Sequence, residues 1–272
     1  MNNSMISAMV SMNGIQQRLD LIADNMANVN TVGYKRKEAA FQDTLNSVMQ
    51  QSSDFQLAGR ATPLGVNMGF GSRMSELSLN YTQGTMKETG NMTDLAIQGN
   101  AMFQVVTQDG EVGFTRAGNF NLQPSPEDPA TSYLVTSLGN PVLDTDGELI
   151  EVPSGSNLHI DGAGNIIAVD GTTETEVGRI GLVTLLRPDA LIQKDSNLFV
   201  LPPGEMEGVI IATSDLAEGE QATIRQGVLE NSNVDLANEM AEMMKVQRAY
   251  QLAARALTSS DTMMNLANNL RG

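Results

Sequence analysis

The sequence predicts an α+β protein, with long N- and C-terminal heptad helices paired as a coiled coil and a central antiparallel β domain of short hairpins. Three observations predict this fold class. Apolar residues recur every seven positions at both ends, apolar and polar residues alternate in the middle, and Asp-Gly pairs punctuate that middle. We therefore expect a discontinuous helical domain (1–34 with 232–272), a short helix with an extended connector (35–75), and the β domain (76–231).

The N-terminal stretch from Ser4 to Asn30 is expected to form one long helix. Its apolar residues occupy the a and d positions of a heptad repeat, which favours a helical seam over a strand. We expect this helix to end near Gly33, a residue that readily adopts the left-handed C-cap conformation. The predicted N-terminal assembly seam is Met5, Met12, Ile15, Leu19, Ile22, Met26 and Val29.

The following segment is less regular. Residues Glu38 to Gln51 are expected to form a short helix, with Phe41, Leu45 and Val48 on one side. The stretch from Ser52 to Arg73 is rich in Ser, Gly and Asn and includes Pro63, so it is interpreted as an extended connector.

Strand signals dominate from Met74 to Gly227. Leu77, Leu79 and Tyr81 alternate with polar residues, as do Phe103 and Val105. Asp-Gly between such alternations is a strong hairpin signal, because these residues tolerate the positive φ angles of tight turns. The four pairs are Asp109-Gly110, Asp146-Gly147, Asp161-Gly162 and Asp170-Gly171.

The C-terminal stretch is the second long helix. Ser232 with Asp235 three residues later resembles a capping box at its start. One row of residues is seven apart, from Leu236 to Met264, and a small or polar companion row runs from Met240 to Asp261. The predicted C-terminal assembly seam is Leu236, Met240, Met243, Tyr250, Leu257 and Met264.

A narrow apolar stripe on a long helix needs a partner. Two partners are open at this point: the other terminal helix of the same chain, or helices of neighbouring subunits. The stripes are rich in Met, whose flexible side chain packs against varied surfaces, and this favours several neighbours over one fixed mate.

Charge and composition exclude several classes of function. The net charge is −16, and the region from Glu88 to Glu230 holds 22 acidic and 5 basic residues, which would repel nucleic acid. The absence of Cys excludes disulfides and thiolate chemistry. No apolar run is long enough to span a membrane. The N-terminal stretch lacks the basic segment and apolar run of a Sec-type signal peptide, so any export is expected to proceed without cleavage.

The candidate chemical motifs are weak. The single histidine, His159, lies in a strand-like alternation and is interpreted as an ordinary strand residue. Asp144 to Glu148 has the carboxylate density of a calcium loop, but its glycine is misplaced and the bidentate glutamate is missing, so a hairpin turn is favoured. We expect no catalytic, cofactor-binding or metal-binding residues, and hence a protein that is not an enzyme.

Both ends and most of the middle resemble the flagellar rod and hook family. The N-terminal signature is Asn28-Val29-Asn30-Thr31-Val32-Gly33-Tyr34-Lys35, with Asn28, Asn30, Thr31, Gly33, Tyr34 and Lys35 as its motif residues. The middle contributes Thr89-Gly90-Asn91, Asp94 to Ile97 and Phe114 to Phe120. The C-terminal signature runs from Gln226 to Val234 and through Gln247-Arg248-Ala249-Tyr250, with Ser232, Asn233, Gln247 and Arg248 as its motif residues.

The resemblance implies a structural subunit of the bacterial flagellar rod in the basal body, closest to the distal rod members because of its length and its Pro63-Leu64-Gly65 connector. Such subunits stack helically into a torque-transmitting shaft around the export channel and leave the cell through the flagellar type III apparatus. Identical subunits and neighbouring rod and hook proteins are the implied partners, without nucleic acid or a small-molecule substrate. The alternatives are a proximal rod or hook-like axial protein, a secreted cell-wall enzyme and a monomeric binding module.

Overall fold

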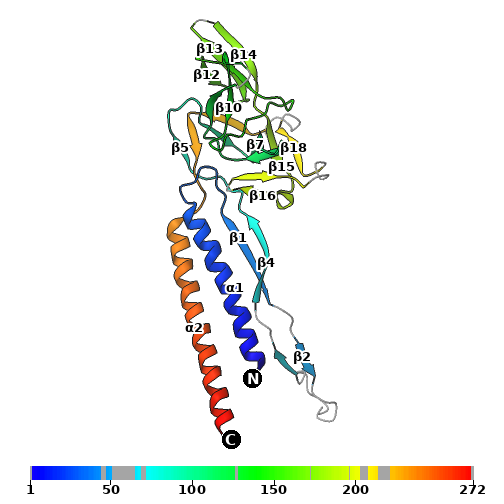
Figure 1. Ribbon diagram of the computed structural model, residues 1–272, viewed down its shortest axis with the longest axis vertical. Helices are drawn as coiled ribbons and strands as arrows, with labels where there is room; N and C mark the ends of the chain where they lie inside the picture. Colours follow the sequence, from blue (N-terminus) through cyan, green and yellow to red (C-terminus); the bar gives the residue numbers. More distant parts are fainter. Residues whose placement is uncertain are drawn as a thin grey trace. The chain divides into compact units, whose positions relative to one another are not determined.

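The computed structural model describes residues 2–43, 47–50, 65–68, 72–125, 128–171, 173–195, 197–202, 208–213 and 221–270. The chain forms two compact units (Figure 1). We call the first the helical unit (Met1–Ala27, Lys37–Ser78 and Asp235–Gly272) and the second the β unit (Asn28–Arg36 and Leu79–Val234). The predicted division into three domains (1–34 with 232–272, 35–75 and 76–231) stays a prediction.

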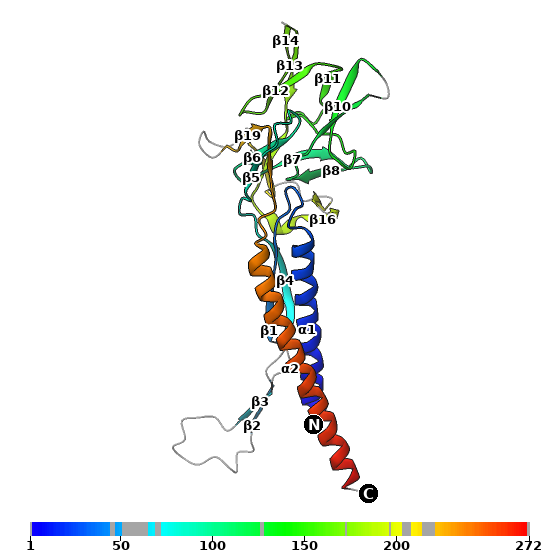
Figure 2. The same ribbon diagram turned by 90° about the vertical axis from the view of Figure 1, so that its left-hand side faces the viewer.

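The helical unit is built on α1 (Asn2–Ala27) and α2 (Leu236–Asn269). The two helices lie side by side and run in opposite directions, as both views show (Figures 1 and 2). Asp235 caps α2, because its Oδ1 accepts the backbone N–H groups of Ala237 (3.0 Å) and Asn238 (3.3 Å). The predicted cap, Ser232, instead accepts the N–H of Val234 at 3.3 Å.

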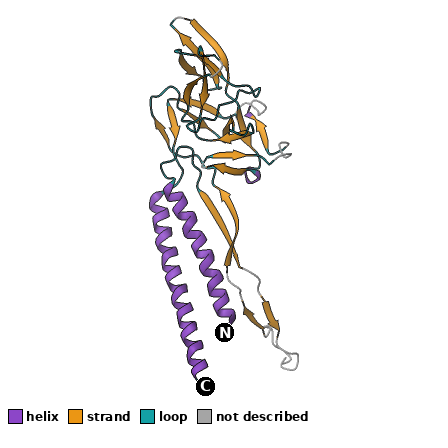
Figure 3. Ribbon diagram, in the orientation of Figure 1, coloured by secondary structure: helices purple, strands orange, loops and turns teal. Residues whose placement is uncertain are grey.

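The predicted heptad coiled coil is wrong. The described residues form two long α-helices and many strands (Figure 3). Of the predicted companion row, Met240 is 47% exposed and Gln247 is also exposed. A coiled coil buries two apolar rows, and the second row here is too polar and too open to be buried.

The predicted short helix at 38–51 is also wrong, because this segment forms strands. Strand β1 (Lys37–Asp43) pairs with β4 (Ser72–Leu79), and β2 (Ser47–Gln50) pairs with β3 (Gly65–Met68). From Lys37 to Gln42 the side chains alternate between half-buried and exposed, which is the period of a strand. Strand β1 packs along α1.

Asn25 fixes the start of β1. The side chain of Asn25 is fully buried, and its amide donates to the Lys37 carbonyl (3.0 Å) and accepts the Lys37 N–H (2.9 Å). This two-way bond reproduces the pairing of an antiparallel strand. A tertiary contact from α1 therefore favours the extended backbone over the helix that local propensity suggests. The extended connector was predicted over 52–73. Its described residues, 65–68 and 72–73, belong to strands β3 and β4, and 52–64, with Pro63 and Leu64, and 69–71 lie outside the described residues.

The β unit consists of short antiparallel strands, as the sequence predicted. Its largest sheet has the order β16-β17-β8-β7-β15-β18, and two three-stranded sheets have the orders β11-β10-β9 and β12-β13-β14. Pairs β19-β6 and β20-β5 join the start of the C-terminal signature to the middle motif region around 86–98. The bounds are β5 Met86–Glu88, β6 Leu95–Gln98, β7 Ala101–Val106, β8 Val112–Thr115, β9 Asn121–Pro124, β10 Thr131–Val135, β11 Glu151–Pro153, β12 Asn157–Ile160, β13 Asn165–Asp170, β14 Thr173–Arg179, β15 Leu182–Leu185, η2 Pro188–Ala190, β16 Ile192–Asp195, β17 Leu198–Val200, β18 Ile210–Ala212, β19 Thr223–Gln226 and β20 Val228–Glu230.

The larger core cluster of the β unit is mostly aliphatic and contains one aromatic pair. Phe103 and Phe120 meet edge to face with ring centroids 5.0 Å apart. Around them pack Leu95, Ile97, Leu134, Val142, Ile166 and Ile180, all at most 1% exposed. A second cluster, around Phe114 and Phe199, lies within the same unit.

Three of the four Asp-Gly pairs form the predicted turns. Gly110, Gly147 and Gly171 have φ angles of 80°, 81° and 62°. The fourth turn, between β12 and β13, places its positive φ at Gly164 rather than at Gly162. The loop is longer here: the Asp161 N–H donates to the Asn165 carbonyl at 3.1 Å, and the Asp161 carbonyl accepts the Gly164 N–H at 2.9 Å.

Candidate functional site

The signature loop (28–36) folds as part of the β unit. The Thr31 hydroxyl donates to Asn28 Oδ1 at 3.1 Å, and the Thr31 N–H donates to the Asn28 carbonyl at 3.2 Å. Gly33 has a φ of +70°, and a Cβ at this position would lie 2.6 Å from the backbone of Arg116 and Ala117. Gly33 is therefore needed for close backbone approach, not for the predicted C-cap, because α1 already ends at Ala27.

A buried ion cluster lies directly after this glycine. Lys35 Nζ and Arg116 Nε each lie 2.7 Å from one of the two carboxylate oxygens of Glu230. All three residues are at most 5% exposed. We call Lys35, Arg116 and Glu230 the ion cluster. Its members come from the N-terminal signature, the middle motif and the C-terminal signature, so the three motifs meet at the Glu230 carboxylate.

Backbone groups complete the cluster. Lys35 Nζ also donates to the Thr82 carbonyl at 2.9 Å, and Arg116 donates to the carbonyls of Ile97 (3.0 Å) and Ala101. The Gly84 N–H donates to Glu230 Oε1 at 2.9 Å. Buried charges are tolerated when their hydrogen-bonding capacity is filled in this way.

The electrostatics favour the charged form of the carboxylate. Burial by itself would raise the pKa of Glu230, but the Arg116 charge and the hydrogen bonds from Lys35 and Gly84 outweigh burial and hold that pKa below its ordinary value. Burial also lowers the pKa of the Lys35 ammonium, and the bond to Glu230 offsets only part of this effect.

The C-terminal signature provides a second connection. Asn233 Oδ1 accepts the Arg36 N–H at 2.7 Å, and its amide donates to the carbonyls of Asn80 (2.8 Å) and Thr82 (3.0 Å). One side chain thus joins the signature loop to the segment that follows β4. Ser232 is buried beside it, whereas Gln247 and Arg248 lie exposed on α2.

Sequence reasoning named Lys35 and Asn233 but did not single out Arg116 or Glu230. Both lie inside the quoted motifs. The available signal was a lone carboxylate closing the apolar Val228-Leu229 strand, which is typical of a buried, paired charge. The basic run Lys35-Arg36-Lys37 is not a free cationic surface, because Lys35 pairs with Glu230 and Lys37 pairs with Asp24 at 2.6 Å.

The helical unit carries a different kind of candidate site, because α2 is apolar on two sides. Its shielded stripe includes Val246, which is 5% exposed, with Met243, Tyr250 and Leu257 half-buried. A second set is strongly exposed: Leu252, Met263, Leu266 and Leu270 are 62% to 83% exposed. At about 100° of rotation per residue, the two sets lie on opposite sides of the helix. We call the second set the outer stripe.

The predicted seam residues divide between these environments. Leu236 and Met240 are exposed, and the side chains of Met5 and Met264 lie outside the described residues. In the N-terminal seam Ile22 is buried, and Met12, Ile15, Leu19, Met26 and Val29 are half-buried. Arg18 connects the two helices through Glu242 at 2.9 Å and covers the Phe41 ring at 5.8 Å.

The structure adds no chemistry to the weak motifs. His159 lies in β12 as an ordinary strand residue, and the described residues contain no group of three or more metal-ligating side chains. Neither α1 nor α2, over its described residues, is long and apolar enough to cross a membrane.

Three family models match consecutive parts of the chain. Residues 6–35 match "Flagella basal body rod protein", residues 96–184 match "Flagellar hook protein FlgE/F/G D1 domain", and residues 225–270 match "Flagellar basal body rod FlgEFG protein C-terminal". The matched ranges contain Lys35, Arg116 and Glu230 respectively.

Curated proteins match the chain over its full length. It is 34% identical to the flagellar basal-body rod protein FlgG of Bacillus subtilis, covering 100% of both chains. It is 33% identical to FlgG of Borreliella burgdorferi, covering 100% of this chain and 99% of that protein. It is 31% identical to the flagellar hook-basal body complex protein FlhP of B. subtilis, again over 100% of both.

Proposed function

The chain belongs to the flagellar basal-body rod family, and from this premise we propose that its copies stack helically through the exposed faces of α1 and α2 into a torque-transmitting shaft. At the level of the family, the protein is a structural rod subunit of the flagellar basal body that assembles with other rod and hook subunits, and this family is not one of enzymes.

The two-sided apolar character of α2 carries the proposal. A helix that only completed its own chain would be polar on its outer side. The outer stripe of α2 is instead apolar, and Ile6 and Met9 of α1 are 48% and 59% exposed. Exposed apolar surface of this kind marks a protein interface. Helices of sister subunits are the partners that a repeating shaft provides.

The charge distribution supports the proposed layering. The sequence outside 88–230 carries 10 acidic and 11 basic residues, so the helical ends are nearly neutral and can pack closely. The acidic β units form the outer layer of the shaft, where water screens their repulsion. The helices line the central channel, and each new subunit arrives through the flagellar type III export apparatus. The position we favour is the distal rod.

The test places charge on the outer stripe. Leu252→Asp with Leu266→Asp should leave the far-ultraviolet circular dichroism of the purified chain unchanged and remove the protein from isolated basal bodies, because a carboxylate cannot enter an apolar interface. The matched control is Gln251→Asp with Thr258→Asp, two exposed polar positions of the same helix outside the outer stripe. Normal motility and normal incorporation of the Leu252/Leu266 variant would refute the proposal.

A further inference from the structure

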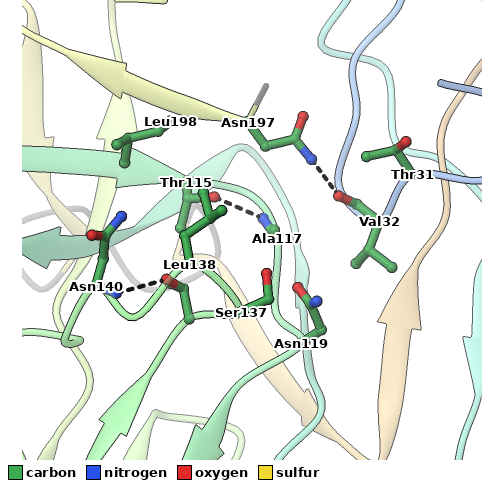
Figure 4. Close-up of a pocket in the computed structure, with 11 residues that line it drawn as sticks. Thr31, Val32, Thr115, Ala117, Asn119, Ser137, Leu138, Asn140, Asn197 and Leu198 are labelled. Carbon is green, nitrogen blue, oxygen red and sulfur yellow. Dashed lines mark hydrogen bonds between the residues drawn. The ribbon is translucent and has the colours of Figure 1, made fainter. Parts of the chain in front are cut away.

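The β unit contains a pocket beside the signature loop that the rod proposal leaves unused. Its volume is about 200 Å³, and Thr31 and Val32 of the loop form one wall (Figure 4). The remaining lining residues come from the end of β8 and the segment after it, from the turn at 136–140, and from the start of β17. They are Thr115, Ala117, Asn119, Thr136, Ser137, Leu138, Asn140, Asn197 and Leu198.

One wall residue offers a polar side chain to an occupant. Asn140 is 5% exposed, and its backbone N–H donates to the Thr136 hydroxyl at 3.1 Å. A side-chain amide can both donate to and accept from the backbone of a segment that enters the pocket. Two other wall side chains are engaged within the unit: Asn197 donates to the Val32 carbonyl, and Thr115 accepts the Ala117 N–H at 3.1 Å (Figure 4).

The size and charge of the pocket restrict its occupant. No lining residue is charged, although the pocket lies in a strongly acidic unit, so an ion is a poor fit. Small-molecule sites measure about 300–1,000 Å³, which is more than this pocket provides. One flexible aliphatic side chain with a polar backbone beside it fits the aliphatic walls and the amide.

The chain itself offers one segment of this kind. Among the described β-unit residues with exposed large apolar side chains, Met92 is 54% exposed and lies on a tight turn in which the Asp94 N–H donates to the Asn91 carbonyl at 3.1 Å. Gln226 holds the Met92 carbonyl at 2.8 Å, so the turn is presented rigidly. Its one carboxylate, Asp94, is 8% exposed and accepts the Thr89 hydroxyl at 2.7 Å.

The other exposed apolar side chains of the β unit fit less well. Leu122 and Ile192 lie in strands β9 and β16, and Leu149 and Leu186 adjoin Glu148 and Arg187. Leu138 belongs to the pocket itself. Methionine is unbranched and enters irregular cavities more easily than leucine. The uncharged Met92 turn also avoids the repulsion that two acidic units otherwise experience.

We propose that this pocket receives the Met92 turn of a second copy's β unit. Pocket and turn occupy different places on one unit, so the contact is heterologous and repeats into an open array rather than closing as a dimer. The proposal rests on the proposed function, because it needs copies that polymerise, and it adds a second contact that lies in the β units.

The chain has no Cys, so introduced thiols report single contacts. Asn91→Cys and Ser137→Cys alter exposed residues beside the turn and at the pocket, and both leave Met92 in place. Cells carrying both substitutions in one chain, treated with a short bis-maleimide, should give a ladder of cross-linked multimers. Each single variant should give only monomer. Adding Met92→Asp to the double variant should reduce the ladder at least about tenfold, since truncation of an interface anchor has effects of this size.

Two controls separate this proposal from the rod function. Asn91→Cys paired with Leu149→Cys, which is exposed elsewhere on the β unit, should give no ladder. Leu252→Cys on the outer stripe reports polymerisation through the helices. A cross-link from Leu252→Cys in motile cells without any ladder from the Asn91/Ser137 pair overturns the pocket contact and leaves the rod function intact. A dimer from either single variant also overturns it, because the contact would then be isologous.

Discussion

The two units of this chain bury their apolar residues to very different extents. The β unit encloses Phe103, Phe114 and Phe120 at 1% exposure or less and also buries the charged residues Lys35, Asp94, Arg116 and Glu230. In the helical unit, among residues whose side chains are described, Ile22 and Val246 are the large apolar residues that are fully buried. The β unit has a large buried core of its own, whereas most apolar side chains of the helical unit stay partly or fully exposed. Stability should therefore reside mainly in the β unit, and the main assembly contacts in the helical unit.

The largest effect should follow from opening the ion cluster. Glu230→Gln leaves Lys35 and Arg116 buried without a counter-charge, and loss of one partner of a buried pair costs about 3–5 kcal/mol. Urea unfolding of the purified chain, followed by the β circular dichroism signal, measures this loss. Glu176→Gln, the same change at an exposed position of β14, should stay within about 0.5 kcal/mol. Equal urea midpoints of unfolding for the two variants would show that the ion cluster does not stabilise the β unit.

Acid should weaken the β unit through the same carboxylate. The pKa of Glu230 is lower in the folded than in the unfolded state, so its contribution is fully present above the unfolded pKa of about 4.3. This contribution disappears as the pH falls through the lower, folded value. Unfolding free energies measured from pH 7 downward should therefore drop more steeply below that range in the native chain than in Glu230→Gln. Parallel pH profiles would contradict the assignment.

A smaller effect is expected at the start of α2. Asp235→Ala removes a side chain that accepts two backbone N–H groups, and loss of such a cap costs about 1 kcal/mol. Helical circular dichroism during thermal unfolding measures the change. Asp261→Ala, an exposed position within the helix, is the matched control. If Asp235→Ala lowered the circular dichroism signal of the β unit and left the helical signal unchanged, Asp235 would be stabilising the β unit rather than α2.

The smallest effect should come from the outer stripe. Leu252→Ala with Leu266→Ala should change the unfolding free energy of the purified chain by no more than about 0.5 kcal/mol, because both side chains are already in water. Phe103→Ala, in the core of the β unit, should cost about 3–5 kcal/mol. A clear destabilisation of the Leu252/Leu266 variant in the monomer would mean that the stripe is covered within its own chain.

Local patterns predicted the elements better than their partners. The two terminal helices, the antiparallel β region and three of the four Asp-Gly turns follow from periodicity and turn chemistry. The segment 37–43 could not be predicted as a strand, because Asn25 of α1 determines its backbone. The coiled coil failed because heptad spacing specifies a face and does not specify how deeply that face is buried.

The site was accessible from the sequence only in part. Motif resemblance identified Lys35 and Asn233, since both lie in recognisable signatures. The carboxylate that joins the motifs was not identified, because its pairing with Arg116 spans 114 residues and leaves no local periodic trace. The outer stripe was likewise obscured, because its spacing differs from the heptad row that dominates α2.

The Lys35–Glu230 pair joins residues 195 positions apart in the chain. Such distant pairing forms late, since the intervening loop must first close. Whichever end of a new chain emerges first, the oppositely charged residue near the other end is still absent, so the Lys35–Glu230 pair cannot form. The β unit therefore cannot complete its fold in a chain that has emerged only in part.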